Sequence, residues 1–253
     1  MNQLFDLTGR TAVVTGGNRG LGRGMAEGLA EAGAKVMILA SSDSVFAAAE
    51  EMRAAGLDVS GLKCDLGDRA QVDRVFGEAV EALGGRLDIL VNNAGVQRRH
   101  PCEEFPLEDW DTVININLNS VFQMCQLAGR VMLRQGRGKI INVASMLSFF
   151  GGFTVPAYAA SKGGVAQLTK ALTNEWAGRG INVKAIAPGY MDTEMNTRLI
   201  EDAGRNAEIS ARIPMHRWGT PEDMKGTVVF LASDASNYLS GAVIPVDGGY
   251  LAK

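Results

Sequence analysis

A tyrosine and a lysine four residues apart are the strongest candidates for chemistry in this sequence. Tyr158 and Lys162 stand in the segment VPAYAASKGG, where every other residue is small or apolar. On a helix, positions i and i+4 share a face, so the phenol and the ammonium would point the same way. A tyrosine packed over a lysine stem at a surface is the alternative for an isolated pair, so other segments must distinguish the two.

A tyrosine that exchanges protons near neutral pH needs a strongly lowered pKa. The ordinary value is about 10, and reaching about 7 requires roughly 4 kcal/mol of phenolate stabilisation. The Lys162 ammonium and a second positive charge beside the phenol would supply it. Such a pair suits alcohol–ketone interconversion, in which a proton moves at the oxygen and a hydride at the carbon. Ser145, at the end of the apolar run KIINVAS, would orient that oxygen. A serine that caps a strand end is the alternative.

The elements that must position these side chains follow a repeated strand–helix order. Seven apolar runs have the length of strands: 11–15, 35–40, 58–64 (the weakest), 87–93, 139–145, 181–188 and 242–249. Helical patterns that close on glycine separate most of them. Strands that are apolar on both faces are typical of a parallel sheet covered by helices on both sides. We therefore predict a single α/β domain over residues 1–253, a doubly wound Rossmann-type fold with about seven parallel strands.

Composition excludes several classes of function. The 253 residues are 46% hydrophobic and 21% charged, and the net charge of -3 provides no basic surface for nucleic acid. The start has no secretory pattern, and no apolar run approaches the roughly 18 residues of a membrane span, so we expect an unanchored cytoplasmic protein. Cys64, Cys102 and Cys125 lack CxxC spacing, and only two histidines are present. We therefore expect neither a disulfide framework nor a metal site.

A glycine-rich loop lies between the first strand and the first helix. The segment TGGNRGLG places Gly16, Gly20 and Gly22 in a GxxxGxG spacing, which differs from the common GxGxxG fingerprint. A tight turn would explain the glycines alone. Between a strand and a helix, however, such a loop is where a nucleotide pyrophosphate meets a helix N-terminus. No Lys-Ser/Thr pair follows the loop, so a nucleotide cofactor is favoured over a bound triphosphate.

Five motifs in order resemble the short-chain dehydrogenase/reductase family over essentially the whole chain. They are TGGNRGLG, NNAG at 92–95, Ser145, the YxxxK of Tyr158 and Lys162, and PGYMDT at 188–193. The resemblance implies an NAD(P)-dependent oxidoreductase that acts on CH–OH groups. It adds Asn117 to the catalytic set, with a carbonyl that holds a water between Lys162 and solvent. The alternative from another class is a non-catalytic dinucleotide-binding sensor or scaffold, which would not need Ser145, Tyr158 and Lys162.

The resemblance also implies which residues hold the cofactor. Asp65 would lie beside the adenine, and Thr193 would contact the nicotinamide carboxamide or cap the following helix. Asn92 and Gly95 would border the adenosine ribose and stabilise the central sheet rather than perform chemistry. The predicted cofactor contacts are Gly16, Asn18, Arg19, Gly20, Leu21, Gly22, Ser41, Ser42, Asp65, Leu66, Asn92, Gly95, Tyr158, Lys162, Pro188, Gly189 and Thr193.

The end of the second strand bears on the choice between the two nicotinamide cofactors. Members that prefer NAD carry an acidic residue there, which accepts the ribose 2′-hydroxyl. This strand ends MILASSD, without a carboxylate at that place. Arg19 could pair with a 2′-phosphate, assisted by Ser41 or Ser42. Alternatively, Arg19 lies along the helix surface and Asp43 reaches the hydroxyl. We expect NADP(H), with NAD(H) as the other possibility.

Three segments over the nicotinamide would set the substrate, namely 96–104, 146–156 and a lid at 190–218. They resemble family members that act on keto or hydroxy sugar acids. Arg98 and Arg99 could hold a carboxylate bidentately, with Arg217 as a candidate from the lid, although a solvated face or a subunit contact also explains an arginine pair. The predicted substrate contacts are Arg98, Arg99, Ser145, Met146, Tyr158, Tyr190 and Arg217. The resemblance further implies a homotetramer, paired through the small-residue helix that contains Tyr158.

Overall fold

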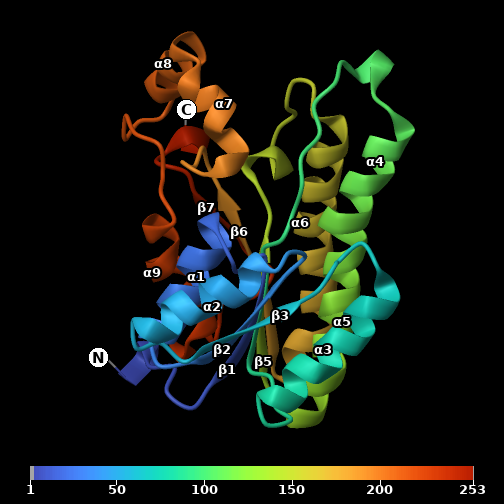
Figure 1. The fold of residues 1–253 in the computed structure, drawn as a ribbon, viewed down its shortest axis with the longest axis vertical. Helices are drawn as coiled ribbons and strands as arrows, with labels where there is room; N and C mark the ends of the chain where they lie inside the picture. Colours follow the sequence, from blue (N-terminus) through green and yellow to red (C-terminus); the bar gives the residue numbers. More distant parts are fainter. Residues whose placement is uncertain (1–2, 253) are drawn as a thin grey trace.

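The computed structural model describes residues 3–252, which form a seven-stranded parallel sheet between two layers of helices (Figure 1). The strands are β1 (Thr11–Thr15), β2 (Lys35–Ala40), β3 (Val59–Lys63), β4 (Ile89–Asn92), β5 (Gly138–Val143), β6 (Ile181–Pro188) and β7 (Val243–Val246). Their spatial order is β3-β2-β1-β4-β5-β6-β7, so the chain starts in the middle and winds outward in both directions. The predicted doubly wound fold is confirmed.

Two helical layers cover the sheet because its strands are apolar on both faces. One layer contains α1 (Gly20–Glu31), α2 (Ser44–Ala54) and α9 (Glu222–Ala232), and the other contains α3 (Arg69–Ala82), α5 (Ser120–Gln135) and α6 (Pro156–Trp176). Adjacent residues of β1 serve opposite layers: Val14 belongs to the first core and Val13 to the second. Within residues 3–252, no helix combines the length and apolarity required to cross a bilayer.

A π-helical turn joins two helices next to the sheet. The segment Asn115–Asn119 adopts this conformation between α4 (Leu107–Ile114) and α5. Such turns occur mostly as single insertions in α-helices and are frequent at functional sites. Apolar spacing alone does not distinguish a π-turn from an α-turn, so the sequence pattern did not predict it.

The chain after β6 forms a separate small layer above the carboxyl end of the sheet. It contains α7 (Thr197–Glu201) and α8 (Ala203–Arg212), which lie beside the C-terminus in Figure 1. A third apolar cluster holds this layer down and includes Met146, Ile209, Ile213 and Tyr250. Residues 190–218 therefore pack against the segment that follows β5 and against the C-terminus.

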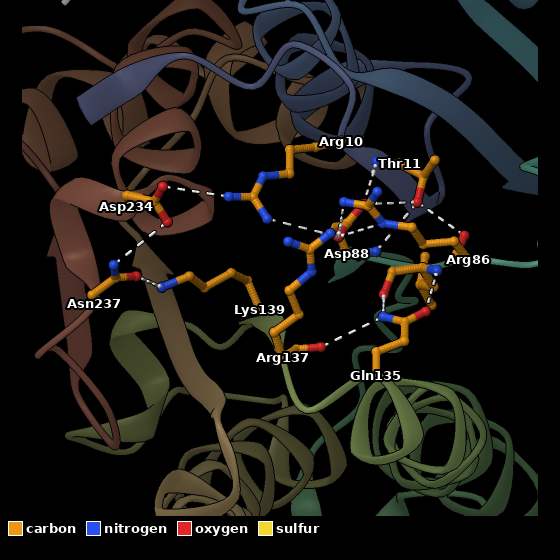
Figure 2. Close-up of polar contacts among 10 residues, drawn as sticks. Arg10, Thr11, Arg86, Asp88, Gln135, Arg137, Lys139, Asp234 and Asn237 are labelled. Carbon is orange, nitrogen blue, oxygen red and sulfur yellow. Dashed lines mark hydrogen bonds and ion pairs between the residues drawn. The ribbon is translucent and has the colours of Figure 1, made fainter. Parts of the chain in front are cut away.

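A buried carboxylate ties the amino ends of the strands together, opposite the end that carries the site. Asp88, only 3% exposed, accepts hydrogen bonds from the Thr11 backbone at 2.9 Å and from the Arg86 guanidinium at 2.9 and 2.7 Å. Arg10 and Arg137 approach the same carboxylate at 3.8 and 3.5 Å (Figure 2). This network links the residues at the starts of β1, β4 and β5.

Candidate active site

A cleft of about 550 Å³ opens at the carboxyl ends of six strands, β1 to β6. Parallel strands present their carboxyl ends at one edge, which is where doubly wound folds bind ligands. Of the cofactor contacts predicted from the sequence, all line this cleft except Asn92. The segments from β1, β2, β3, β4, β5 and β6 that meet here are separated widely along the chain, so the sheet order brings them together.

The glycine loop fits a nucleotide pyrophosphate. Gly16 has a φ of 65°, and a Cβ on Gly22 would lie 2.1 Å from the Gly16 carbonyl oxygen. Glycine is therefore required for the tight passage from β1 into α1. Arg19, at the N-cap of α1, makes no side-chain capping hydrogen bond. Within residues 3–252, no side chain is seen to accept from the first N–H groups of this helix, and these are the donors that an anionic pyrophosphate takes.

Ser145, Tyr158 and Lys162 converge at one side of the cleft. Tyr158 and Lys162 lie on the first turns of α6, whose start is set by Pro156 at its first position, and Ser145 follows β5. The buried Lys162 ammonium lies 5.7 Å from the Tyr158 ring centroid and donates a hydrogen bond to the Val143 carbonyl at 2.6 Å. The Ser145 side chain lies beside the Tyr158 phenol and acts to lower its pKa. The structure therefore brings together the three residues that the sequence singled out.

Burial acts on the pKa values of both titratable side chains in this group. Removal of water raises the pKa of the Tyr158 phenol, and the Ser145 side chain opposes this effect only in part. Burial also lowers the pKa of the Lys162 ammonium to about 8. Burial thus opposes the lowering of the Tyr158 pKa, so the second positive charge that we expected in addition to Lys162 is needed to lower it.

Asn117 is a buried anchor within the π-turn and does not line the cleft. Its side-chain oxygen accepts from the Val96 N–H at 2.8 Å, and its NH₂ donates to the Val96 carbonyl at 2.9 Å and to Ser161 at 3.3 Å. A Cβ on Gly95 would lie 3.2 Å from the Asn117 side-chain oxygen and 3.8 Å from the Lys162 nitrogen. Asn117 thus ties the chain after β4 to α6 beside Lys162.

Apart from two of the candidate arginines, three predicted contacts lie outside the cleft. Asn92 is buried and donates to Asn142 at 2.9 Å, which links β4 to β5 and agrees with the expected stabilisation of the sheet. Met146 belongs to the apolar cluster under α8. Tyr190 packs edge-on against Trp218, with ring centroids 5.3 Å apart. These three side chains pack against residues far from them in the sequence. Their position along the chain therefore did not show that they point away from the cleft.

Of the three candidate arginines, the structure brings only Arg98 into the cleft. Its Nε lies 3.2 Å from Asp109, whose second oxygen lies 2.7 Å from His100 Nε2. Arg99 is exposed outside the cleft. Arg217 borders a second cavity of about 150 Å³ and binds both oxygens of Asp223 at 2.7 Å. This pairing holds the pKa of the Asp223 carboxyl well below its usual range and occupies the guanidinium.

The corner at the end of β2 has no free carboxylate from that strand. Ser41 and Ser42 line the cleft, and the Asp43 carboxylate is paired with Lys63 at 2.9 Å. Arg19 also lines the cleft, and it forms an ion pair with Glu194. The sequence offered no signal for Glu194, because its partner is 175 residues away.

The nicotinamide end of the predicted cofactor site lies at Thr193. This residue occupies the N-cap position of the helical turn Glu194–Asn196, yet its side chain makes no capping hydrogen bond. Thr193 lines the cleft, and its side chain is not engaged as a cap. Thr193 therefore occupies the predicted N-cap position but does not form the capping hydrogen bond.

A parallel doubly wound sheet with a nucleotide cleft and a Ser-Tyr-Lys group at its carboxyl edge defines a nicotinamide-dependent oxidoreductase. The chain belongs to the short-chain dehydrogenase/reductase family, and the family model described as "Enoyl-(Acyl carrier protein) reductase" matches residues 16–251.

Proteins named 2-dehydro-3-deoxy-D-gluconate 5-dehydrogenase are similar over their full length. The protein from Pseudoalteromonas atlantica is 48% identical, with 100% of both chains covered, and the protein from Escherichia coli K12 is 49% identical, with 98% of each covered.

A solved structure shows the same architecture with a ligand. The gluconate 5-dehydrogenase of Burkholderia cenocepacia, described in complex with NADP and tartrate, superposes with a TM-score of 0.95. It is 40% identical, and the match covers 99% of this chain and 98% of the other.

Proposed function

We propose that the protein transfers a hydride between a nicotinamide cofactor and a keto or hydroxy sugar acid of the 2-dehydro-3-deoxy-D-gluconate or 2-deoxy-D-gluconate type. The observation that carries the proposal is the convergence of Ser145, Tyr158, Lys162 and Arg98 on one cleft. The names of the similar proteins support sugar acids as the substrate class. Gluconate 5-dehydrogenase activity is the second candidate, favoured by the similar solved structure.

The residues of the cleft then have distinct roles. The cofactor, when bound, accepts or supplies the hydride at the substrate carbon. During oxidation Tyr158 takes the hydroxyl proton as that carbon loses its hydride, and during reduction it returns a proton to the carbonyl oxygen. Ser145 donates a hydrogen bond to the same oxygen. Lys162 stabilises the phenolate by its charge, and Asn117 is a positioning residue that fixes the chain beside Lys162.

Arg98 is the proposed partner of the substrate carboxylate. Its Nε is held by Asp109 and one terminal nitrogen donates to the Gln97 carbonyl at 3.2 Å. Among the described residues the other terminal nitrogen has no hydrogen-bond partner, so it is available to an anion. The Asp109 contact limits the rotation of the guanidinium, which reduces the entropy lost when a carboxylate binds.

A spectrophotometric screen tests the function and this assignment together. The purified protein is assayed with NADPH, NADH and their oxidised forms against sugar acids and the matching neutral sugars. Turnover is expected with sugar acids, and Arg98→Ala should raise their KM about ten- to a hundredfold without affecting neutral sugars, because a charge-assisted bond is lost. Arg130→Ala, which removes an exposed arginine of α5, is the control. Absence of turnover with every sugar acid would refute the proposed function, and an unchanged KM would refute the role of Arg98.

We propose NADP(H) as the preferred cofactor. Support comes from Arg19, Ser41 and Ser42 at the cleft and from the pairing of Asp43 with Lys63. A 2′-phosphate would meet a guanidinium and hydroxyl donors there, with no carboxylate from β2. The ratio of kcat/KM for NADPH and NADH measures the preference, and a value below one contradicts it.

Assembly as a cytoplasmic homotetramer also belongs to the proposal. Leu107, Trp110 and Phe122 are exposed apolar side chains on α4 and α5, and a Cβ on Gly163 of neighbouring α6 would meet no atom within 4 Å. This apolar surface favours pairing of subunits through these helices. The three cysteines are unpaired, in keeping with a reducing compartment. Sedimentation at micromolar concentration should give four times the chain mass, and a population of monomers alone would disprove the assembly.

A further inference from the structure

An ion pair joins the two sides of the proposed cofactor cleft at its mouth. Arg19 precedes α1, whereas Glu194 follows Thr193 at the start of the segment after β6, and both residues line the cleft. Their side chains are 69% and 70% exposed, and the guanidinium contacts the Glu194 carboxylate directly. The arginine proposed to recognise a 2′-phosphate therefore already has an anionic partner.

The backbone supports this proximity independently of the two long side chains. A Cβ on Gly20 would lie 3.6 Å from the Thr193 methyl carbon, which is ordinary van der Waals contact. The glycine loop and residue 193 are thus adjacent in space. Residues 19 and 194 each stand next to one of these two, so the ion pair follows from the packing of the two segments.

Among the described residues, other acidic groups near this corner have different partners or positions. The Asp43 carboxylate is held by Lys63 at 2.9 Å. Asp65 accepts from the Gly67 N–H at 2.9 Å. β2 ends in Ala40 and is followed by two serines. Glu194 is therefore the carboxylate that contacts the cationic group of the 2′-phosphate corner.

We propose that Glu194 is a specificity-determining residue that limits the preference for NADP(H) over NAD(H). It supplies from the segment after β6 the negative charge that β2 lacks. A phosphate dianion that pairs with Arg19 must either displace Glu194 or lie beside its negative charge. Either effect reduces the binding free energy that Arg19 contributes to NADP(H). NAD(H) has no phosphate at this position, so its affinity is insensitive to Glu194. The inference rests on the proposed cofactor site.

The proposed role of Glu194 is tested by measuring equilibrium binding of NADPH and NADH to the purified protein. In Glu194→Gln, the Kd for NADPH should fall about two- to fivefold, the change expected when a carboxylate is removed from an exposed charged site. The Kd for NADH should change less than twofold. Because these charges are exposed, the gain should shrink when the ionic strength is raised.

Two further variants separate a specific effect from a change in total charge. Glu51→Gln removes another exposed carboxylate, which pairs with Arg23 of α1 at 2.7 Å outside the cleft, and it should leave both affinities unchanged. In an Arg19→Ala background, Glu194→Gln should lose its selective effect on NADPH, because the shared partner is absent.

The possible outcomes are distinct. Equal weakening of both cofactors by Glu194→Gln would mean that the ion pair holds the bound cofactor irrespective of its phosphate, and it would overturn the inference. Unchanged affinities would overturn it as well, while tight NADPH binding by the unmodified protein would leave the proposed cofactor site intact. If the unmodified protein bound neither cofactor, the proposed function itself would fail together with the inference.

Discussion

Replacing Tyr158 by Phe should lower kcat for sugar-acid turnover about a hundred- to ten-thousandfold, the range expected when a general acid–base group is removed. The phenol ring remains in place, so packing on α6 should change little. Both cofactors should bind with nearly unchanged Kd, since the first-turn donors of α1 and the loop at Gly16 are untouched. Steady-state kinetics in both directions, with binding titrations on the same preparation, measure the two effects.

Tyr238→Phe provides the matched control. Tyr238 is fully exposed and lies outside the cleft, so removal of its hydroxyl should leave kcat unaltered. A Tyr158→Phe variant that retained most of its kcat would remove Tyr158 from the proton-transfer step. Loss of cofactor binding in that variant would instead indicate that the phenol holds the cofactor.

Lys162→Met should raise the apparent pKa of Tyr158 and slow oxidation. The buried ammonium is 5.7 Å from the phenol ring, and an opposite charge at such range lowers a pKa by about 1–3 units. At pH 7 the oxidative kcat/KM should therefore fall about ten- to a thousandfold, with the rise in its pH profile displaced to higher pH. Lys170→Met, an exposed lysine on the same helix, is the control. An unshifted profile would show that Lys162 does not act on the phenol.

The same variant should change how stability depends on pH. The pKa of Lys162 is lowered from 10.5 to about 8 in the folded protein by burial. Between these two values the unfolded chain binds the extra proton, so the contribution of Lys162 to the free energy of unfolding rises with pH in this window and is absent below it. Urea unfolding at pH 7 and pH 9.5 should show a larger increase for the unmodified protein than for Lys162→Met. Parallel changes would contradict the lowered pKa.

Most of the fold and the central chemistry are local properties of the sequence. The largely apolar run at 181–188 coincides with β6, and the run at 11–15 with β1, because a mostly apolar stretch suits a strand buried on both faces. Tyr158 and Lys162 share a face because four residues make about one turn of α6. Gly16 and Gly22 are required by a turn between consecutive elements. Each of these features depends on residues within a few positions of one another.

Only the tertiary structure selected Arg98 from three candidate arginines, placed Asn117 in a π-turn anchored to Val96, and paired Arg19 with Glu194. It also gave Tyr158 a raised pKa, since desolvation depends on everything that surrounds the phenol. These outcomes depend on distances between segments far apart in the chain. The periodicity of apolar residues indicates which face of a helix or strand is buried. It does not indicate which residues that face or the neighbouring loops will contact. The sequence by itself thus determined the elements and the reactive pair, whereas the packing of distant segments decided their charges and partners.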